Sequence, residues 1–431
     1  MSRLRLLVLG AAASLAACST AGEEDISADE GQFQGTVSNL VEMSFDTEVR
    51  APSEAEASRL ITSQLYWLVG PFHDLGGDPR LTWAKTTKLR TEAAEAPRAE
   101  SIVHFNVKLE VAWPKSRAIP QSYDLVLPRR LDSASQSAFY DKYKANCISP
   151  YAHDVDYSNA WYDFKPDRSG CALAADDVIR PKATVKKAQD NTVNTYPEYD
   201  RIWKDKKFQA VVVFGRDDQS STSDRDLGAA EYIKYVAAMR GQAGFTDIRV
   251  KEEEFQDGSK TNKLALVDAK MAGDRTVHVA VFLLAKPSLS TNEFVRRYDP
   301  ETEEADFVAF AGHAGLGGNI QRLQAIGKYK PGQYQVFVYD GCDTFAYVDK
   351  SVFDKKRAAN GAEADPNGTR DFDVILNALP APWTTGDPSV LTLTRKLIDD
   401  RTPTNFEKIL EIFPRSGAPV VVGDEDNKFR P

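Results

Sequence analysis

The sequence predicts an α/β protein, with a doubly wound, mostly parallel sheet in the carboxyl-terminal half preceded by a smaller α+β domain. From residue 205 onward, short and fully apolar runs alternate with segments of helical spacing, as in a parallel sheet that helices cover on both faces. Earlier in the chain, residues 105–113 alternate between apolar and polar side chains, which is typical of a half-buried strand. The length of 431 residues also favours two domains.

The α+β domain is expected to cover residues 33–200. Apolar side chains of one parity between residues 37 and 49 predict a strand. Ser53 and Glu56 then form a capping-box pattern in front of an amphipathic helix. The last part of this region, residues 180–200, is polar and rich in lysine, and we interpret it as the connection to the second domain.

The second domain is expected to cover residues 201–431. Its strands are predicted at five apolar runs, residues 208–214, 277–284, 307–310, 334–338 and 374–379. Its helices are predicted from apolar residues spaced three or four apart at 227–239, 320–326, 390–397 and 406–413, the last of them capped by Thr404. This alternation is the basis for expecting a doubly wound sheet.

Composition and charge exclude several classes of protein. The chain is 42% hydrophobic and 27% charged, which is ordinary for a globular protein, and its four cysteines are too few for a small disulfide scaffold. The net charge of −9 and the lack of a lysine or arginine cluster argue against a nucleic-acid partner, since phosphate contacts need clustered cations. The sequence holds neither a phosphate-binding loop nor a dinucleotide fingerprint, so no cofactor is predicted.

No metal site is predicted either. His73, His104 and His153 are scattered along the first domain, and His278 lies inside an apolar run, where we expect a buried and hydrogen-bonded histidine. The acidic segment at residues 424–427 could hold a structural Ca²⁺ through oxygen ligands. A solvated acidic tail is the favoured interpretation of that segment.

The first residues have the pattern of an export signal. Arg3 and Arg5 precede an apolar run from residue 6 to residue 17. A basic start, a short apolar stretch and small residues at its end are typical of a secretory signal peptide. The run is too short to span a bilayer, which takes roughly 20 apolar residues.

The end of this run, Leu-Ala-Ala-Cys18, resembles the lipobox of bacterial lipoproteins. The resemblance implies that residues 1–18 are the signal peptide and lipobox and that Cys18 is lipidated, which makes the membrane a partner through a lipid anchor. Ser19 after the cysteine implies sorting to the outer membrane of the bacterial cell envelope. The polar residues 19–32 are then expected to form a tether.

Three cysteines remain after Cys18. Cys147 and Cys171 lie 24 residues apart in a stretch with the character of a loop, and paired cysteines persist in the oxidising compartment of an exported protein. We therefore predict a disulfide between them, worth roughly 3 kcal/mol in the chain-entropy model. Cys342 is left as an unpaired thiol, either reactive or a small buried hydrophobic residue.

Two of the predicted strands end in reactive residues. The run 307–310 is followed by Ala-Gly-His313, and the run 334–338 is followed by Tyr-Asp-Gly-Cys342. The two residues are 29 positions apart, about the length of one strand–helix–strand crossover. If the strands are neighbours, about 4.8 Å apart, the thiol and the imidazole emerge side by side, which suits a nucleophile and its base.

At these residues the chain resembles the caspase-like class of cysteine peptidases, which groups caspases, legumain, gingipains, clostripain, separase and CHAT domains. The segments Phe-Ala-Gly-His313 and Asp-Gly-Cys342-Asp-Thr are most similar to the separase and CHAT branch. The strand and turn at residues 374–383 are also similar to that branch, and the resemblance extends over residues 205–431.

The resemblance implies a caspase-like fold and a role for each site residue. Cys342 is the expected nucleophile and His313 the general base and acid, acting on a protein or peptide substrate. The backbone N–H groups of Gly315 and Cys342 are the expected oxyanion donors. From their place after the first strand, Asp217 and Asp218 are expected to line a pocket for a basic side chain, and Asp343 is a third candidate for that pocket.

Two departures from the family pattern leave two hypotheses open. Ala314 stands directly after His313, where the class has glycine, and Asp343 beside the thiol should disfavour the thiolate. The leading hypothesis is an envelope-anchored cysteine endopeptidase that forms an acyl-enzyme. The alternative is a non-catalytic binding or scaffold lipoprotein with a degenerate caspase-like domain.

Overall fold

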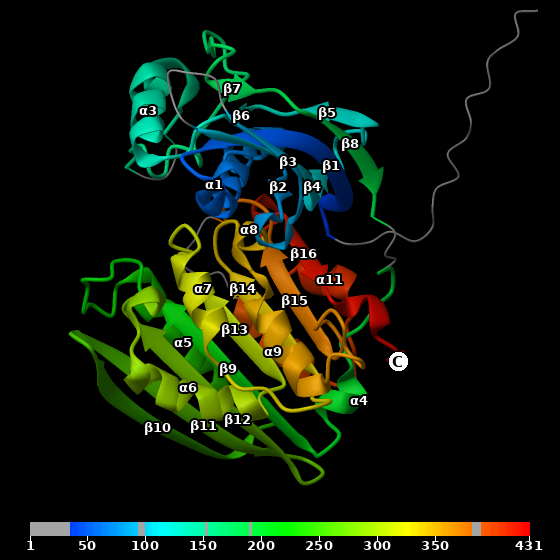
Figure 1. Ribbon diagram of the computed structural model, residues 1–431. Coiled ribbons are helices and arrows are strands. Elements are labelled where there is room, and N and C mark those ends of the chain that lie inside the picture. The colour runs from blue at the N-terminus through cyan, green and yellow to red at the C-terminus, as the bar shows by residue number, and fades with distance from the viewer. Residues whose placement is uncertain (1–34, 94–99, 151–153, 189–191, 382–388) are drawn as a thin grey trace, which may run out of the picture. The chain divides into compact units, whose positions relative to one another are not determined.

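The computed structural model of the chain describes residues 35–93, 100–150, 154–188, 192–381 and 389–431 (Figure 1). All of these residues belong to one compact unit. The expected signal peptide, Cys18 and the tether lie outside the described residues, as do His153 and the end of the turn at Trp383. Within the described ranges, no helix is both long and apolar enough to cross a membrane.

The first sheet is built around two long antiparallel strands, β1 (Ser38–Ala51) and β4 (Ser101–Pro114), which pair along their whole length. The sheet has the order β2-β4-β1-β8-β5, with β3 also paired to β4. The bounds of the other strands are Asp78–Pro79 for β2, Lys85–Ala93 for β3, Ser122–Asp124 for β5 and Lys182–Lys187 for β8. Helix α1 (Glu54–Tyr66) packs against β1, and a buried apolar core lies between them.

The predicted strand at residues 37–49 and the predicted helix after Ser53 are confirmed as β1 and α1. Alternate side chains of β1, among them Val41, Met43 and Phe45, are buried as the parity predicted. Ser53 is the N-cap, but its side chain makes no capping bond, and its carbonyl oxygen accepts from the Glu56 N–H at 3.2 Å. The helix start was therefore predicted correctly, while the side-chain bonds of a capping box are not formed.

The interpretation of residues 180–200 as a connection was partly wrong. Strand β8 lies within this range and pairs with both β1 and β5, so it is an interior strand of the first sheet. Ala183 and Val185 are buried, while the lysines that alternate with them are exposed. The high lysine content of residues 182–187 led to the wrong prediction of a connection where a half-buried strand is present.

The predicted disulfide between Cys147 and Cys171 is present. Cys147 is the last residue of helix α3 (Ser133–Cys147). The bond closes a loop that holds Phe164, which packs edge-on against Trp67. A two-stranded ribbon of β6 (Leu127–Pro128) and β7 (Val178–Ile179) lies on either side of this segment in the sequence.

The second sheet has eight strands in the order β10-β11-β12-β9-β13-β14-β15-β16. Strands β12, β9, β13, β14 and β15 are mutually parallel, and β10, β11 and β16 add to them antiparallel. Their bounds are Lys207–Gly215 for β9, Thr246–Asp257 for β10, Lys260–Met271 for β11, Arg275–Leu284 for β12, Phe307–Ala311 for β13, Gln335–Asp340 for β14, Phe372–Asn377 for β15 and Pro419–Val422 for β16. The five predicted apolar runs coincide with the five parallel strands.

Helices cover both faces of this sheet, as Figure 1 shows. On one face the core includes α6 (Asn292–Glu304), α7 (Gly318–Ala325) and α9 (Lys350–Asn360). On the other face it includes α4 (Tyr199–Ile202), α5 (Leu227–Arg240), α10 (Ser389–Ile398) and α11 (Phe406–Leu410). The mostly parallel, two-faced α/β arrangement predicted from the sequence is therefore confirmed.

Three local features differ from the prediction. The hairpin β10–β11 was missed, because its strands carry many charged residues and one exposed face. The cap of α11 is Asn405, whose side chain accepts from the Lys408 N–H at 3.1 Å, and not Thr404. His278 is bound on its two ring nitrogens by Asp268 at 2.7 Å and Glu301 at 2.9 Å, so it joins two carboxylates at the sheet surface instead of lying in the core.

Candidate active site

A pocket of about 500 Å³ lies beyond the carboxyl ends of the five parallel strands, and each of those strands leads into residues that line it. In chain order these strands are β9, β12, β13, β14 and β15, and across the sheet they follow the order 2-1-3-4-5. Doubly wound sheets of this order bind ligands where the strand order reverses. Here that point falls between β9 and β13, so the topology itself favours this pocket as a site.

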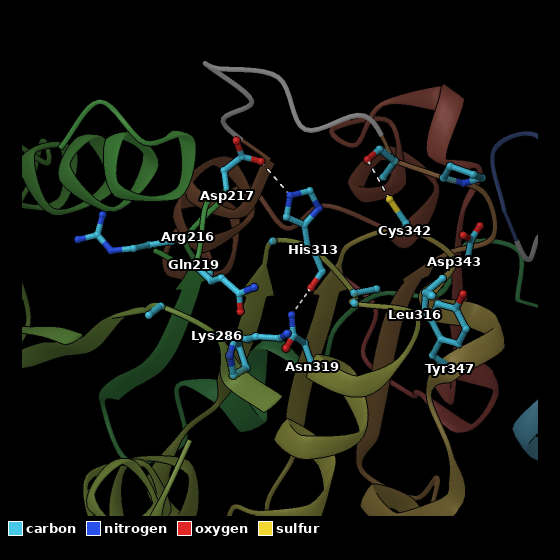
Figure 2. A pocket seen from close by; sticks show the side chains of 18 of the residues that line it. Arg216, Asp217, Gln219, Lys286, His313, Leu316, Asn319, Cys342, Asp343 and Tyr347 are labelled. Carbon is cyan, nitrogen blue, oxygen red and sulfur yellow. Dashed lines mark hydrogen bonds and ion pairs between the residues drawn. The ribbon is translucent and has the colours of Figure 1, made fainter. Parts of the chain in front are cut away.

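His313 follows β13 and points into the pocket beside Asp217, which follows the neighbouring strand β9 (Figure 2). The Nε2 atom of His313 lies 2.8 Å from Oδ1 of Asp217, and both side chains are about half exposed. The Asn319 amide donates to the carbonyl oxygen of His313 at 2.7 Å and accepts from the Ser288 N–H at 2.9 Å. The histidine is thus fixed at its ring by Asp217 and at its backbone by Asn319.

Cys342 follows β14 and lines the same pocket, and its side chain is partly buried. The thiol donates to the carbonyl oxygen of Ala381 at 3.6 Å, and not to His313 (Figure 2). Burial and, secondly, the negative charge of Asp343 raise the pKa of Cys342 to about 12. The resting thiol is therefore neutral at physiological pH.

The loops of His313 and Cys342 meet through two glycines. A Cβ atom on Gly341 would lie 2.7 Å from the carbonyl oxygen of Gly312, closer than such atoms approach. Gly312 has φ of 156°, and a Cβ there would lie 3.3 Å from the backbone of Gly215. The glycine before each reactive residue therefore lets the backbones after β9, β13 and β14 approach one another.

The backbone around the expected oxyanion donors is not strained at Ala314. Gly315 has the left-handed conformation, with φ of 62°. Ala314 does not have a positive φ, and its side chain is buried. Within the described ranges, the N–H groups of Gly315 and Cys342 donate to no carbonyl oxygen of another residue. Both residues line the pocket, so an acceptor on a bound molecule could use these donors.

The three aspartates expected to recognise a basic side chain have other roles. Asp217 lines the pocket but is paired with His313. Asp218 is outside the lining, and its carboxylate accepts from the N–H and the hydroxyl of Ser220 at 2.8 and 2.6 Å. Asp343 lines the pocket, but its carboxylate is fully buried. The expectation was therefore wrong for Asp218, and the other two carboxylates are already engaged.

Asp343 is engaged by residues from the first half of the chain. Its Oδ2 accepts from the Tyr162 hydroxyl at 2.7 Å, and its Oδ1 lies 3.0 Å from Nε2 of His73. His73 belongs to α2 (Val69–Leu75), and the same Nε2 atom lies 3.8 Å from Asp78 of β2. This buried cluster was not predicted, because its members are separated by up to 270 positions and carry no shared sequence motif.

Two further supporting residues were also missed. Asn377 at the end of β15 donates to Asp340 at 2.9 Å and to the carbonyl oxygen of Gly341 at 3.1 Å, which ties the Cys342 loop to the next strand. A single polar residue inside the predicted apolar run 374–379 was the available signal for Asn377. Asn319 had a weaker signal, its position at the start of the helix that follows His313.

Among the described residues, no three or more His, Cys, Asp or Glu side chains are arranged to hold a metal ion. His104 of β4 lies near Glu48 and Glu92, far in the sequence from the pocket residues. In the acidic segment at residues 424–427, Asp424 is buried and accepts from the Thr195 hydroxyl at 2.5 Å. That segment therefore turns partly inward and is not the fully solvated tail that we favoured.

No protein-family model, no curated protein and no solved structure matches this chain. The chemistry of the pocket therefore has to be inferred from the residues that line it.

Proposed function

We propose that this protein is a cysteine endopeptidase of the caspase-like class, which acts through a Cys–His dyad and an acyl-enzyme. The observation that carries the proposal is that Cys342, His313 and Asp217 line one pocket at the ends of three neighbouring parallel strands. A nucleophile, a base and a third group that orients the base are the parts that covalent catalysis requires. The carboxylate at 2.8 Å from His313 supports this more strongly than the dyad alone.

In the proposed reaction, the sulfur of Cys342 attacks the carbonyl carbon of a peptide bond. His313, which Asp217 orients at Nε2, takes the thiol proton. The N–H groups of Gly315 and Cys342 stabilise the oxyanion. His313 then gives the proton to the leaving amine as the C–N bond breaks, and water hydrolyses the thioester with His313 as the base.

The high pKa of Cys342 determines how the first step proceeds. A thiol with a pKa of about 12 is almost entirely protonated at neutral pH, so His313 has to remove the proton as the sulfur attacks. Hydrogen bonds in catalytic sites are often long without substrate and shorten in the complex. We therefore expect a bound peptide to displace the thiol from the Ala381 carbonyl oxygen and bring it within reach of His313.

The direct test is cleavage of a diverse peptide library by the purified protein, followed by mass spectrometry. We expect wild type to release new termini, Cys342→Ala to release none, and His313→Ala to be at least about 100-fold slower, since general base catalysis contributes about 10²–10⁴-fold. Asp218→Asn, at a carboxylate outside the pocket lining, is the matched control and should cleave like wild type. Cleavage that persists in Cys342→Ala, or no cleavage by any form, would contradict the proposal.

One observation favours the non-catalytic alternative. In the resting protein the thiol is neutral and donates to the carbonyl oxygen of Ala381. A thiol in this state suits a pocket that binds a segment of protein without cleaving it. This alternative predicts that library peptides bind to wild type and to Cys342→Ala with equal affinity and stay intact. Equilibrium binding and cleavage measured on the same peptides separate the two functions.

The proposal also assigns the protein to the bacterial cell envelope, anchored by lipid at Cys18 and sorted to the outer membrane. It is supported by the lipobox-like sequence Leu-Ala-Ala-Cys18. Fractionation of cells that express the full chain is the test. We expect wild type in the outer-membrane fraction and Cys18→Ala outside it, and equal distributions would contradict the anchor.

A further inference from the structure

The residue after Cys342 is held by side chains from the first half of the chain. We propose that His73 and Tyr162 are positioning residues that hold the Asp343 carboxylate away from the Cys342 sulfur, so that the first half of the molecule sets the reactivity of the thiol. The inference rests on the proposed function only in taking Cys342 as the reacting group.

The first observation is the way in which the Asp343 carboxylate is bound. One oxygen accepts the Tyr162 hydroxyl at 2.7 Å and the other lies 3.0 Å from Nε2 of His73. All of this occurs in a buried environment, since Asp343 is fully buried and the side chain of His73 is 10% exposed. Figure 2 shows Asp343 on the side of Cys342 that faces away from His313.

The second observation is the backbone at Asp343. Its φ is 52°, in the left-handed region that residues other than glycine seldom adopt. Asp343 is also the N-cap of α8 (Thr344–Tyr347), where an aspartate usually accepts from the first turn, but its side chain makes no capping bond. The carboxylate contacts Tyr162 and His73 in place of this local partner, and a strained residue persists only where its surroundings hold it.

The third observation is the state of Asp78. This carboxyl is fully buried and lies 3.8 Å from Nε2 of His73. Burial and, secondly, the charge of Asp343 raise its pKa well above the ordinary range. Asp78 also lies farther from Nε2 of His73, at 3.8 Å, than the Asp343 carboxylate does, at 3.0 Å.

The charge of Asp343 acts on the thiol of Cys342 because the two residues are adjacent in the sequence. The negative charge of Asp343 contributes to the raised pKa of the thiol, after burial. The other ionisable groups that face this region are Asp78 from β2, Tyr162 from the disulfide-closed loop, Tyr347 from α8, Asp340 at the end of β14 and His313 after β13. The side chains placed within 3.0 Å of the Asp343 carboxylate are those of Tyr162 and His73.

The test is the rate of Cys342 alkylation by iodoacetamide between pH 7.5 and 9.5, measured by mass spectrometry on the full chain. We expect His73→Gln to slow alkylation about ten-fold and Tyr162→Phe to slow it less, since each removes a side chain that holds the Asp343 carboxylate away from the sulfur. Asp343→Asn removes that charge, tolerates the left-handed backbone, and should accelerate alkylation. Asp78→Asn should change the rate less than His73→Gln does, because Asp78 lies farther from Nε2 of His73 than Asp343 does.

The decisive comparison is the double variant His73→Gln/Asp343→Asn. If His73 acts through Asp343, its substitution changes nothing once the charge is removed, so the double variant should react as fast as Asp343→Asn. His104→Gln, the same change on another histidine of the first sheet that lies near carboxylates, controls for loss of stability. The inference would be overturned if His73→Gln left the alkylation rate unchanged. It would also be overturned if adding His73→Gln to Asp343→Asn slowed alkylation as much as His73→Gln slows it in the wild-type protein.

This readout separates the inference from the proposed function. Alkylation needs no substrate turnover, so the coupling of His73 to Cys342 is measured even in a protein that cleaves nothing. If peptides stay intact but the coupling holds, the endopeptidase proposal fails and the positioning role stands. If peptides are cleaved but His73 has no effect on Cys342, the endopeptidase proposal stands and the positioning role fails.

Discussion

Two single residues, both glycines, control how closely the reactive side chains can approach. Gly312 and Gly341 each stand directly before a reactive residue, and a Cβ on Gly341 would lie 2.7 Å from the Gly312 carbonyl oxygen. Because the obstacle is backbone, it cannot be relieved by a side-chain rotation. We conclude that the repeated pattern of glycine before His313 and before Cys342 serves the packing of the two loops.

Gly341→Ala should therefore separate the loops. We expect the variant to lose about 1–3 kcal/mol of unfolding free energy, as overpacked sites do, and to show slower alkylation of Cys342. Urea unfolding and mass spectrometry measure the two effects. Gly241→Ala is the matched control, since a Cβ there makes only an ordinary contact at 3.6 Å, and equal losses in the two variants would contradict the packing role of Gly341.

His278 provides a prediction for the pH dependence of stability. Hydrogen bonds with Glu301 and Asp268 raise its pKa from 6.5 to about 9, so folding favours the charged imidazole. This stabilisation is fully present below about pH 6.5 and is lost as the pH rises through about 9. We expect His278→Gln to lose roughly 3 kcal/mol at pH 6 and little at pH 10, whereas a difference that does not change between these pH values would contradict the assignment.

Among the strands of the second sheet, the five parallel apolar strands could be predicted and the charged strands could not. The runs that became β9, β12, β13, β14 and β15 are buried on both faces, so their composition alone identifies them. Strands β8, β10 and β11 each have an exposed face with lysine or glutamate. Only their pairing with neighbouring strands, which is not local in the sequence, makes these segments strands.

The start of helix α11 can be tested at its cap. Asn405 accepts from the Lys408 N–H, so Asn405→Ala should lower the unfolding free energy by about 1 kcal/mol. Thr404→Val keeps the shape of the neighbouring residue and removes its hydroxyl, whose hydrogen bond to Thr402 is long at 3.4 Å. Chemical denaturation should show the smaller loss for Thr404→Val, and the opposite ranking would restore Thr404 as the cap.

In the molecule as a whole, the candidate site draws on both halves of the chain. His313, Cys342 and their strands could be predicted because the apolar runs, the residues that follow them and the length of the crossover are all local features of the sequence. The contribution of His73 and Tyr162 could not, because their contacts with Asp343 depend on how segments 181 to 270 positions apart pack together. The pairing of Asp217 with His313 was also not predicted, since it depends on the neighbouring positions of β9 and β13 in the sheet.

The disulfide closes the segment that carries Tyr162. We expect Cys147→Ser/Cys171→Ser to lower the unfolding free energy by about 3 kcal/mol and to weaken the effect of Tyr162 on Cys342 alkylation. Thermal unfolding and the alkylation rate are the measurements. Cys342→Ser, with the disulfide intact, controls for the loss of a cysteine, and a double variant as stable as wild type would show that the bond does not support this half of the molecule.

The function of the pocket depends on whether His313 and Cys342 act together as base and nucleophile. The measurement that decides this is the rate at which a peptide chloromethyl ketone, which fills the pocket as a substrate would, alkylates Cys342 at pH 7 in wild type and in His313→Ala, with Cys342→Ala as the blank. We expect loss of the imidazole to slow the reaction about ten-fold or more. Equal rates in wild type and His313→Ala would show that the imidazole does not activate the thiol.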